Sequence, residues 1–420
     1  MGKRTARWIC AVALTALICA GTSGCSDLDG RALLEVDARV ALADQAVHVR
    51  ISGLPPGGEV TVTAQAVDRK GMPWHAQATF RADRHGLVAL DTATPTSGTY
   101  RCPDAMGLFW SMVPQTGDPD HTSFVPPASQ HHAYDVTLTA TAHGHRFASR
   151  TVTREWFATG VTSRRLTVAS DKVSGSLYLP RPGTVRHPAV LVFGGSEGGN
   201  SSESAAALLA SHGYPALALG YFDLPGLPHS LENIPLEYFV TAARLLAARP
   251  EVDPRHILAM GYSRGSEAAL LLADDYPGLI HGAVVYSPSA QVNGGFPHYS
   301  SAAWTKDGEP VTDGLIPLKH VSGPVMAIAG SDDHLWTSTL WAQQIVEELD
   351  GSGNRYPHQA LIYPHAGHGV GTFPYLAAGT RPLHPLTGRE IDLGGTRAGD
   401  AAAQEAGWHR VLALLASLGP

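Results

Sequence analysis

The run GYSRG at residues 261–265 places Ser263 between two glycines, each two positions away. Gly-x-Ser-x-Gly is the turn that presents a nucleophilic serine for acyl transfer when a buried strand precedes it and a helix follows it. Both flanks are present, because the apolar run HILAMGY leads into Ser263 and SEAALLLA comes after it. The alternative is an ordinary strand-to-helix turn in which Ser263 only caps the helix. The setting favours a nucleophile on a strained turn.

A serine nucleophile needs a general base, and the base needs a carboxylate to orient it. Two later segments supply these groups, since SDDHLW follows the apolar run PVMAIAG and HAGHGV follows QALIYP. We expect Asp333 to be the acid, one short turn past its strand, and Asp332 to bond the backbone of that turn. We expect His368 rather than His365 to be the base, because the glycine beside it permits a sharply turned loop. As metal ligands the two histidines lack a third partner nearby in the sequence.

A tetrahedral oxyanion requires two backbone N–H groups near the nucleophile. One is expected from Arg264, the residue after the serine, and the other from the loop FGGSEGGN, with Gly195 and Ser196 as candidates. This glycine-rich loop lacks the Lys-Ser/Thr pair of a phosphate-binding loop, and the GxGxxG spacing is absent. No nucleotide, metal or other cofactor is therefore expected.

Residues 165–420 have the pattern needed to position these groups. Near-continuous apolar runs alternate with amphipathic helices, which is typical of a mostly parallel, doubly wound sheet covered on both faces. Each candidate group follows one of these runs, at the edge where active sites of such sheets lie. The runs expected to be strands are 188–195, 214–221, 256–262, 282–287, 324–330 and 359–364.

Residues 33–155 follow a different pattern. Short stretches such as EVTVTAQAV and YDVTLTATA alternate apolar and polar residues and are separated by turns such as PPGG and DRHG. This predicts an all-β, immunoglobulin-like sandwich domain that precedes the catalytic domain. His143 and His145 lie two apart there, but exposed strand histidines are a better interpretation than metal ligands.

Residues 1–25 are predicted to direct export. Basic residues precede the apolar run WICAVALTALICA, which is too short to span a bilayer as a helix. The following GTSGC resembles a lipobox, so we expect Cys25 to carry lipid and to anchor a cell-envelope lipoprotein; a plain secreted protein is the alternative. Cys102 is expected to be a small buried side chain. The net charge of -7 gives no reason to expect nucleic acid as a partner.

The chain resembles the acyl-CoA thioesterase / bile acid-CoA:amino acid N-acyltransferase family over nearly its whole mature length. The similarity is carried by WHAQATFRAD and DAMGLFWSM in the β region, and by GGSEGG, YFDLPGLPHSLENIPLEYF, GYSRGSEAALLLA, AGSDDHLWTS and YPHAGHG in the second region. It implies an α/β-hydrolase in which Ser263, Asp333 and His368 are nucleophile, acid and base. It also implies hydrolysis of an acyl thioester through an acyl-Ser263, because the family's acyltransferases carry Cys at that position.

The export signal departs from the family's familiar intracellular members, because CoA thioesters are scarce outside the cytoplasmic membrane. Three alternatives therefore stay open. The protein is an envelope carboxylesterase or lipase that acts on other esters, it transfers acyl groups to an amine, or it is a non-catalytic binding lipoprotein. The insertions 221–233 and 287–314 follow strands at the active-site edge and are expected to wall the acyl pocket. The candidate lining residues are Phe222, Leu224, Leu227, Phe296 and Trp304.

Overall fold

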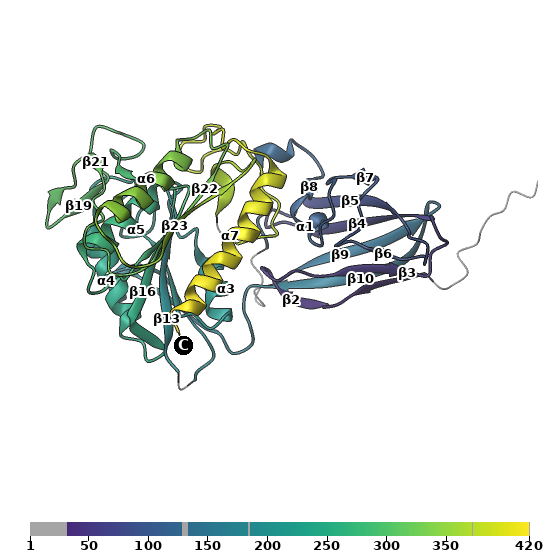
Figure 1. Cartoon of the computed structure of the whole chain (residues 1–420), viewed down its shortest axis with the longest axis horizontal. Helices are drawn as coiled ribbons and strands as arrows, with labels where there is room; N and C mark the ends of the chain where they lie inside the picture. The colour runs from purple at the N-terminus through teal and green to yellow at the C-terminus, as the bar shows by residue number, and fades with distance from the viewer. Residues whose placement is uncertain (1–31, 128–132, 184, 372, 420) are drawn as a thin grey trace, which may run out of the picture.

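The computed structural model describes residues 32–127, 133–183, 185–371 and 373–419. The chain forms an elongated molecule in which a part rich in helices and a part built of β-strands lie end to end (Figure 1). None of the helices in these ranges has the length and apolar character needed to cross a bilayer. The expected export segment, including Cys25, lies outside the described residues.

The C-terminal part is built on one eight-stranded sheet with the order β11-β12-β14-β13-β16-β17-β22-β23. β12 is antiparallel to both of its neighbours, and the strands from β14 to β23 pair in parallel. This order, with one antiparallel strand beside the edge, is that of the α/β-hydrolase fold, as the sequence pattern predicts. The strands are β11 (Thr162–Leu166), β12 (Ser174–Leu179), β13 (His187–Phe193), β14 (Ala216–Gly220), β16 (Val252–Tyr262), β17 (Ala283–Tyr286), β22 (Val325–Gly330) and β23 (His358–Tyr363).

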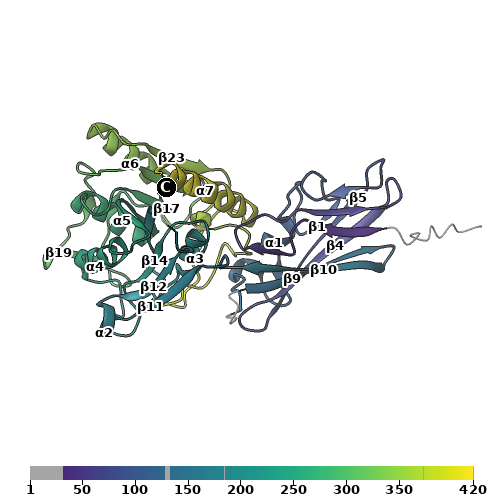
Figure 2. The same ribbon diagram turned by 90° about the horizontal axis from the view of Figure 1, so that it is seen from below.

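Helices cover both faces of this sheet, which is why its central strands are apolar at consecutive positions. In β13, Val190 and Val192 belong to the core on one face, and Leu191 and Phe193 belong to the core on the other. Figure 2 shows α3 and α7 toward the β-rich part and α4 and α5 away from it. Among the described residues, the long helices are α3 (Glu203–Ser211), α4 (Leu236–Ala247), α5 (Arg264–Asp275), α6 (Ser338–Gly351) and α7 (Arg397–Ser417). α2 (Val168–Asp171) is a single turn.

The N-terminal part contains two β-sheets. The strands Glu59–Val67, Pro73–Arg81 and Ala133–Ala142 bury every second residue, so that one side of each faces a core that both sheets share. The smaller sheet is β1 (Leu33–Val36), β3 (Val49–Ser52) and β6 (Val88–Ala89). The larger one is β2 (Val40–Leu42), β10 (His145–Glu155), β9 (Ala133–Ala142), β4 (Glu59–Val67), β5 (Pro73–Arg81), β7 (Ser97–Gly98) and β8 (Val113–Pro114), with the short helical turns α1 (Gly107–Trp110) and η1 (Pro119–His121) between strands.

Three side chains noted in the sequence lie on the surface of this part. Cys102 is a free, exposed thiol, so the expectation that it is buried is wrong; it lies in a loop outside any strand. His143 lies in the turn between β9 and β10, His145 is the first residue of β10, and both are exposed. Within the described residues, no group of three or more His, Cys, Asp or Glu side chains is arranged to hold a metal ion.

The two parts share a continuous hydrophobic core that runs from the N-terminal sheets to α3 and α7. A buried carboxylate crosses this boundary. Asp44 Oδ2 accepts a hydrogen bond from Trp408 Nε1 at 2.7 Å and lies 2.6 Å from His212 Nε2. Because Trp408 is completely buried on α7, this bond ties the last helix to the N-terminal part.

The insertion between β17 and β22 folds over the carboxyl edge of the large sheet. It pairs with the loop that precedes α4, since β15 (Ile234–Pro235) lies parallel to β19 (Trp304–Lys306) and β19 is antiparallel to β20 (Glu309–Pro310). A second short pair joins β18 (Gln291–Val292) to β21 (Gly314–Leu315). The two expected insertions therefore pack against each other above the strand ends.

Candidate active site

Ser263 lies at the turn from β16 into α5, in a backbone conformation that few residues other than glycine adopt. Its φ and ψ angles are 53° and -121°. Such a positive φ is strained for a side chain with a Cβ atom and persists only where the surroundings enforce it. A Cβ on Gly261 would lie 2.2 Å from the carbonyl oxygen of Gly265, and one on Gly265 would lie 2.2 Å from that of Gly194. The two glycines are thus required by the close approach of three backbone segments.

A chain of hydrogen bonds joins Ser263 to a histidine and an aspartate that follow two other parallel strands. His368 Nε2 lies 2.9 Å from Ser263 Oγ, and His368 Nδ1 lies 2.8 Å from Asp333 Oδ2. Asp333 follows β22, and His368 begins the short helical turn η2 (His368–Val370) after β23. Parallel strands bring all three groups, 105 residues apart at the extremes, to one edge of the sheet.

The structure also distinguishes Asp333 from Asp332 as the acid and His368 from His365 as the base. The side chains of Asp333 and His368 are each only 2% exposed, whereas Asp332 is 55% exposed and pairs with His334 on the surface. The expectation that Asp332 bonds the backbone of this turn is wrong, because the amides of Leu335 and Trp336 donate to Asp333 Oδ1. His365 is exposed and bonds to Ser331 through its backbone only. Asp333 and His368 are therefore the bonded acid and base, and His368 is the one that contacts Ser263.

The loop that carries His368 is fixed by groups that sequence reasoning missed. The His368 carbonyl accepts from the hydroxyls of Tyr262 at 3.0 Å and Ser287 at 2.7 Å. Beneath the loop, Asp400 Oδ1 accepts from the Gly367 amide at 2.7 Å. Burial raises the pKa of Asp400 to about 7, and the nearby Asp333 carboxylate adds to this effect. Nothing in the sequence near residue 400 marks it as part of the site.

The glycine-rich loop after β13 lies against the serine, as expected. A Cβ on Gly195 would come within 2.9 Å of Ser263 Cβ. The amide of Gly195, however, donates to the Glu197 carboxylate at 2.9 and 3.0 Å, so this candidate oxyanion donor is already occupied. The amides of Ser196 and Arg264 have no hydrogen-bond partner among the described residues.

Tyr221 sets the orientation of this loop. Its hydroxyl shares its single proton between the carbonyl oxygens of Gly194 at 2.9 Å and Gly195 at 2.7 Å. Burial raises the pKa of Tyr221 well above its usual range, so the hydroxyl keeps its proton and remains a donor. Tyr221 therefore holds both carbonyls of this loop on the side of its own ring.

A cavity of about 350 Å³ opens beside Ser263. Of the five expected lining residues, only Phe296 lines it. Phe222 and Trp304 are wrong as lining residues because both are buried in the core beneath the insertions, and Leu224 and Leu227 do not contact the cavity either. The lining is Ser196, Ser263, Arg264, Asn293, Phe296, Pro297, Tyr299, Leu335, Trp336, His384, Thr387, Arg389, Glu390 and Ile391.

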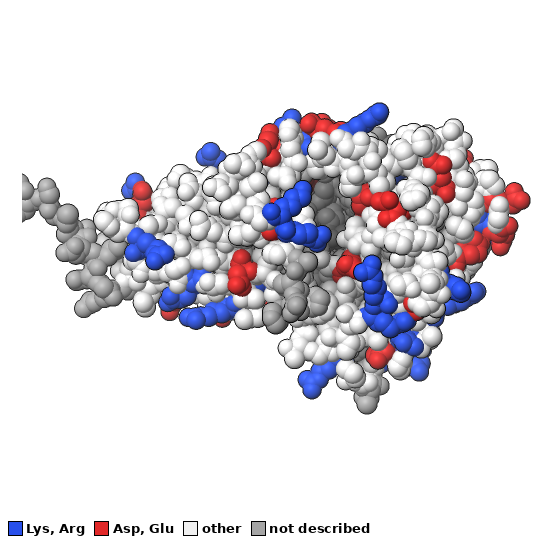
Figure 3. Space-filling view, turned by 180° about the vertical axis from the view of Figure 1, so that it is seen from behind, with Lys and Arg blue, Asp and Glu red and all other residues white. Residues whose placement is uncertain are grey.

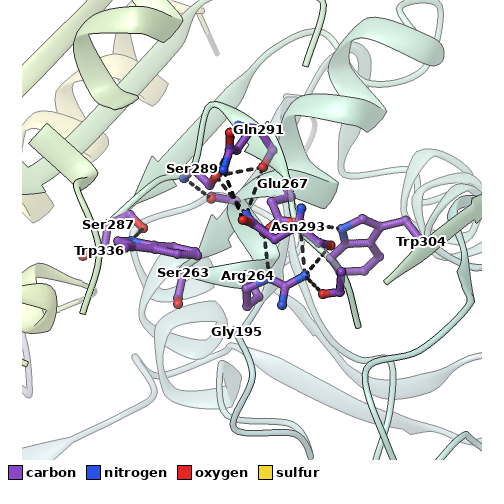
Figure 4. Close-up of polar contacts among 12 residues, drawn as sticks. Gly195, Ser263, Arg264, Glu267, Ser287, Ser289, Gln291, Asn293, Trp304 and Trp336 are labelled. Carbon is purple, nitrogen blue, oxygen red and sulfur yellow. Dashed lines mark hydrogen bonds and ion pairs between the residues drawn. The ribbon is translucent and has the colours of Figure 1, made fainter. Parts of the chain in front are cut away.

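A buried ion pair next to the serine anchors the cavity wall. In Figure 4 the side chains of Arg264, Asn293 and Trp304 converge on Glu267 of α5. Arg264 Nε donates to Glu267 Oε1 at 2.7 Å, and Trp304 Nε1 donates to Oε2 at 2.9 Å. Arg264 Nη2 also donates to the carbonyl of Gly294 at 2.8 Å. The insertion is thus bonded to the helix that begins at the elbow.

The surface on the side opposite the view of Figure 1 carries charges of both signs. In Figure 3, Lys and Arg side chains are interspersed with Asp and Glu, and the surface is hollowed near the middle of this face. No single sign covers the described residues there. On this face the described residues therefore form no broad basic surface for a polyanion.

An α/β-hydrolase sheet with a strained serine, a histidine and an aspartate in hydrogen-bonded series is the arrangement of the serine hydrolases. Two family models match the chain: "Acyl-CoA thioester hydrolase/BAAT N-terminal region" over residues 44–168 and "BAAT / Acyl-CoA thioester hydrolase C terminal" over residues 302–418. The chain belongs to this acyl-CoA thioester hydrolase/BAAT family.

Individual relatives agree with the family. Acyl-coenzyme A thioesterase 6 of Mus musculus is 30% identical over 395 residues, which cover 88% of this chain and 92% of the relative. Acyl-coenzyme A thioesterase 1 of Rattus norvegicus is 31% identical over 402 residues, with the same coverage. Among solved structures, a dienelactone hydrolase-like promiscuous phosphotriesterase from metagenomic libraries is similar, with a TM-score of 0.42 and 18% identity over 62% of this chain and 99% of that one.

Proposed function

We propose that the chain hydrolyses acyl thioesters through a covalent acyl-Ser263 intermediate. The observation that carries this proposal is the hydrogen-bonded series Ser263–His368–Asp333 at the ends of three parallel strands. Ser263 Oγ attacks the thioester carbonyl while His368 Nε2 takes its proton. Asp333 accepts from Nδ1–H, which holds the imidazole in the required tautomer and stabilises the imidazolium that forms.

The tetrahedral intermediate then collapses with loss of the thiol. Its oxyanion accepts from the amides of Arg264 and Ser196, the two donors beside Ser263 that no described residue occupies. The C–S bond breaks, and the proton held by His368 passes to the departing thiolate. Water, deprotonated by His368, attacks the acyl-Ser263 carbonyl, and the proton returns to Ser263 as the carboxylic acid leaves.

The cavity supports an acyl substrate. Phe296, Leu335 and Trp336 give it apolar walls near the serine, and most of its other lining residues, such as Asn293 and Arg389, are polar or charged. The names of the relatives point to acyl-CoA as the thioester. A serine rather than a cysteine as nucleophile favours water over an amine as the acyl acceptor. The same machinery would accept an oxygen ester, which makes an envelope esterase the second candidate.

A substrate panel on the purified mature protein tests the proposal. Acyl-CoA esters of several chain lengths are compared with p-nitrophenyl esters, with and without glycine or taurine, and with Ser263→Ala as the control. We expect thioester turnover that Ser263→Ala abolishes and that amines do not divert. Turnover of the p-nitrophenyl esters with acyl-CoA untouched would show that thioesterase is the wrong activity.

We further propose, from sequence alone, that residues 1–25 direct export and that Cys25 carries lipid. Expression of the whole chain in a bacterium fed labelled fatty acid should label the wild type and not Cys25→Ser; labelling of both would contradict this role.

We also propose that residues 33–155 are an immunoglobulin-like sandwich domain that supports the catalytic domain, residues 165–420. The shared core of the two N-terminal sheets supports this. An experimental structure in which these sheets do not face each other would contradict it.

A further inference from the structure

A second serine–histidine pair lies in the same cavity as Ser263. Ser196 Oγ is 3.1 Å from His384 Nε2, and both residues line the cavity. His384 is 6% exposed, and its ring packs on Phe296 with the centroids 4.9 Å apart. Its backbone is fixed in a turn, since its amide donates to the carbonyl of Arg389 at 2.8 Å. The hydrolytic mechanism described above uses the Ser196 amide but gives the side chains of this pair no role.

The contacts of His384 decide which ring nitrogen carries the proton. Its Nδ1 faces the backbone amide of Leu386 at 3.3 Å, and an amide N–H can only donate. Burial lowers the pKa of His384 below its usual value, so the ring is neutral. A neutral imidazole has one N–H, which must therefore be on Nε2. It follows that His384 donates to Ser196 Oγ and does not accept from it.

This bond leaves the proton of the Ser196 hydroxyl available. The hydroxyl has one donor position and two acceptor positions, and His384 occupies one acceptor position. No described residue accepts from Ser196 Oγ, and the adjoining space is the cavity beside Ser263. A Cβ on Gly195, the residue before Ser196, would come within 2.9 Å of Ser263 Cβ. The hydroxyl therefore lies on the loop that runs close to the nucleophile, the loop from which the proposed mechanism takes the Ser196 amide.

We propose that the Ser196 hydroxyl is a third donor to the oxyanion and that His384 is the positioning residue that aims it. The proposal rests on the proposed thioester hydrolysis and extends its oxyanion site. Held by His384 Nε2–H, the hydroxyl turns its proton into the cavity, where negative charge develops on the carbonyl oxygen. A preorganised donor of this kind stabilises the transition state more than the ground state, so it acts on kcat rather than on KM.

Steady-state kinetics on a thioester tests this in five proteins: wild type, Ser196→Ala, His384→Phe, His384→Gln and the Ser196→Ala/His384→Phe double variant. His384→Phe keeps a ring against Phe296 but has no N–H, whereas the amide of His384→Gln can replace Nε2–H. We expect Ser196→Ala and His384→Phe each to lower kcat roughly tenfold to a hundredfold with KM little changed. The double variant should lose no more than either single variant, and His384→Gln should recover most of the activity.

Several results would overturn the proposal. These are a wild-type kcat for Ser196→Ala, losses that multiply in the double variant, or losses that appear in KM alone. If His384→Phe fails to fold, as a thermal melt would show, Ser196→Ala and His384→Gln still decide the matter. Ser263→Ala, measured alongside, distinguishes a failure of the third-donor proposal from a failure of the proposed thioester hydrolysis. Thioester turnover that requires Ser263 but not the Ser196 hydroxyl refutes only the third donor, whereas no turnover by the wild type refutes both.

Discussion

The buried carboxylate of Glu267 offers a quantitative test of how the cavity wall is held. Its Oε1 accepts from Arg264 Nε at 2.7 Å and from Asn293 Nδ2 at 2.9 Å. Its Oε2 accepts from Trp304 Nε1 at 2.9 Å and from the backbone N–H of Asn293 at 3.3 Å. The side chains of Glu267 and Arg264 are 0% and 6% exposed, so water cannot replace these bonds. We predict that Glu267→Gln destabilises the fold severely.

The magnitude follows from the contacts. Glutamine has the size of glutamate, but one of its terminal atoms is a donor, and every group that faces the two oxygens is a donor. In either amide orientation at least two N–H groups lose their acceptor, at about 1–3 kcal/mol each. The buried Arg264 charge also loses its counterion. Removing one partner of a buried pair costs about 3–5 kcal/mol in total, and we expect a loss of that size.

Urea denaturation followed by tryptophan fluorescence measures the loss as a change in the free energy of unfolding. Glu309→Gln is the matched control, because Glu309 is exposed in the same insertion and should change stability by less than about 0.5 kcal/mol. A loss under about 1 kcal/mol for Glu267→Gln, with an unchanged denaturant slope, would refute the view that this network anchors the insertion.

Three further predictions concern other parts of the molecule. Burial raises the pKa of Asp400 from 3.8 to about 7, so the folded state holds this proton more tightly than the unfolded state does. The free energy of unfolding of the wild type should therefore fall by on the order of 4 kcal/mol between pH 4 and pH 7 because of this group. Urea denaturation at several pH values should show a weaker pH dependence for Asp400→Asn. Asp44→Ala leaves the buried Trp408 indole without its acceptor and should lower the free energy of unfolding by about 1–3 kcal/mol in the same assay; an unchanged value would contradict the bridge between the two parts. Phe296→Ala should raise KM for long-chain thioesters roughly tenfold, the equivalent of about 1.4 kcal/mol of apolar contact, while an equal effect on short chains would argue against an acyl-binding role.

The features predicted from sequence are those encoded locally. The elbow at Ser263 needs only a strand, two glycines and a helix in succession, and all are adjacent in the chain. Asp333 and His368 follow apolar runs, and parallel strand ends meet at one edge of a sheet, so local patterns placed these groups together as well.

What the sequence did not reveal depends on contacts between distant segments. Trp304 is aromatic and lies in an insertion, and these two features suggested a pocket wall. In the structure its indole N–H donates to the buried Glu267 carboxylate, so the side chain lies in the core. The Gly195 amide is taken by Glu197, and His384 enters the cavity from 188 residues beyond Ser196. No periodicity or motif marks such partners, because each is set by the packing of loops on one another.

Active-site labelling followed by peptide mass spectrometry tests the central claim most directly. A fluorophosphonate reacts with an activated serine with loss of fluoride and stays bonded to its oxygen. The proposed mechanism predicts one labelled peptide, containing Ser263, and no labelling of Ser263→Ala at an unchanged melting temperature. Folded wild-type protein that hydrolyses thioesters without being labelled, or that is labelled at another residue, would contradict Ser263 as the nucleophile.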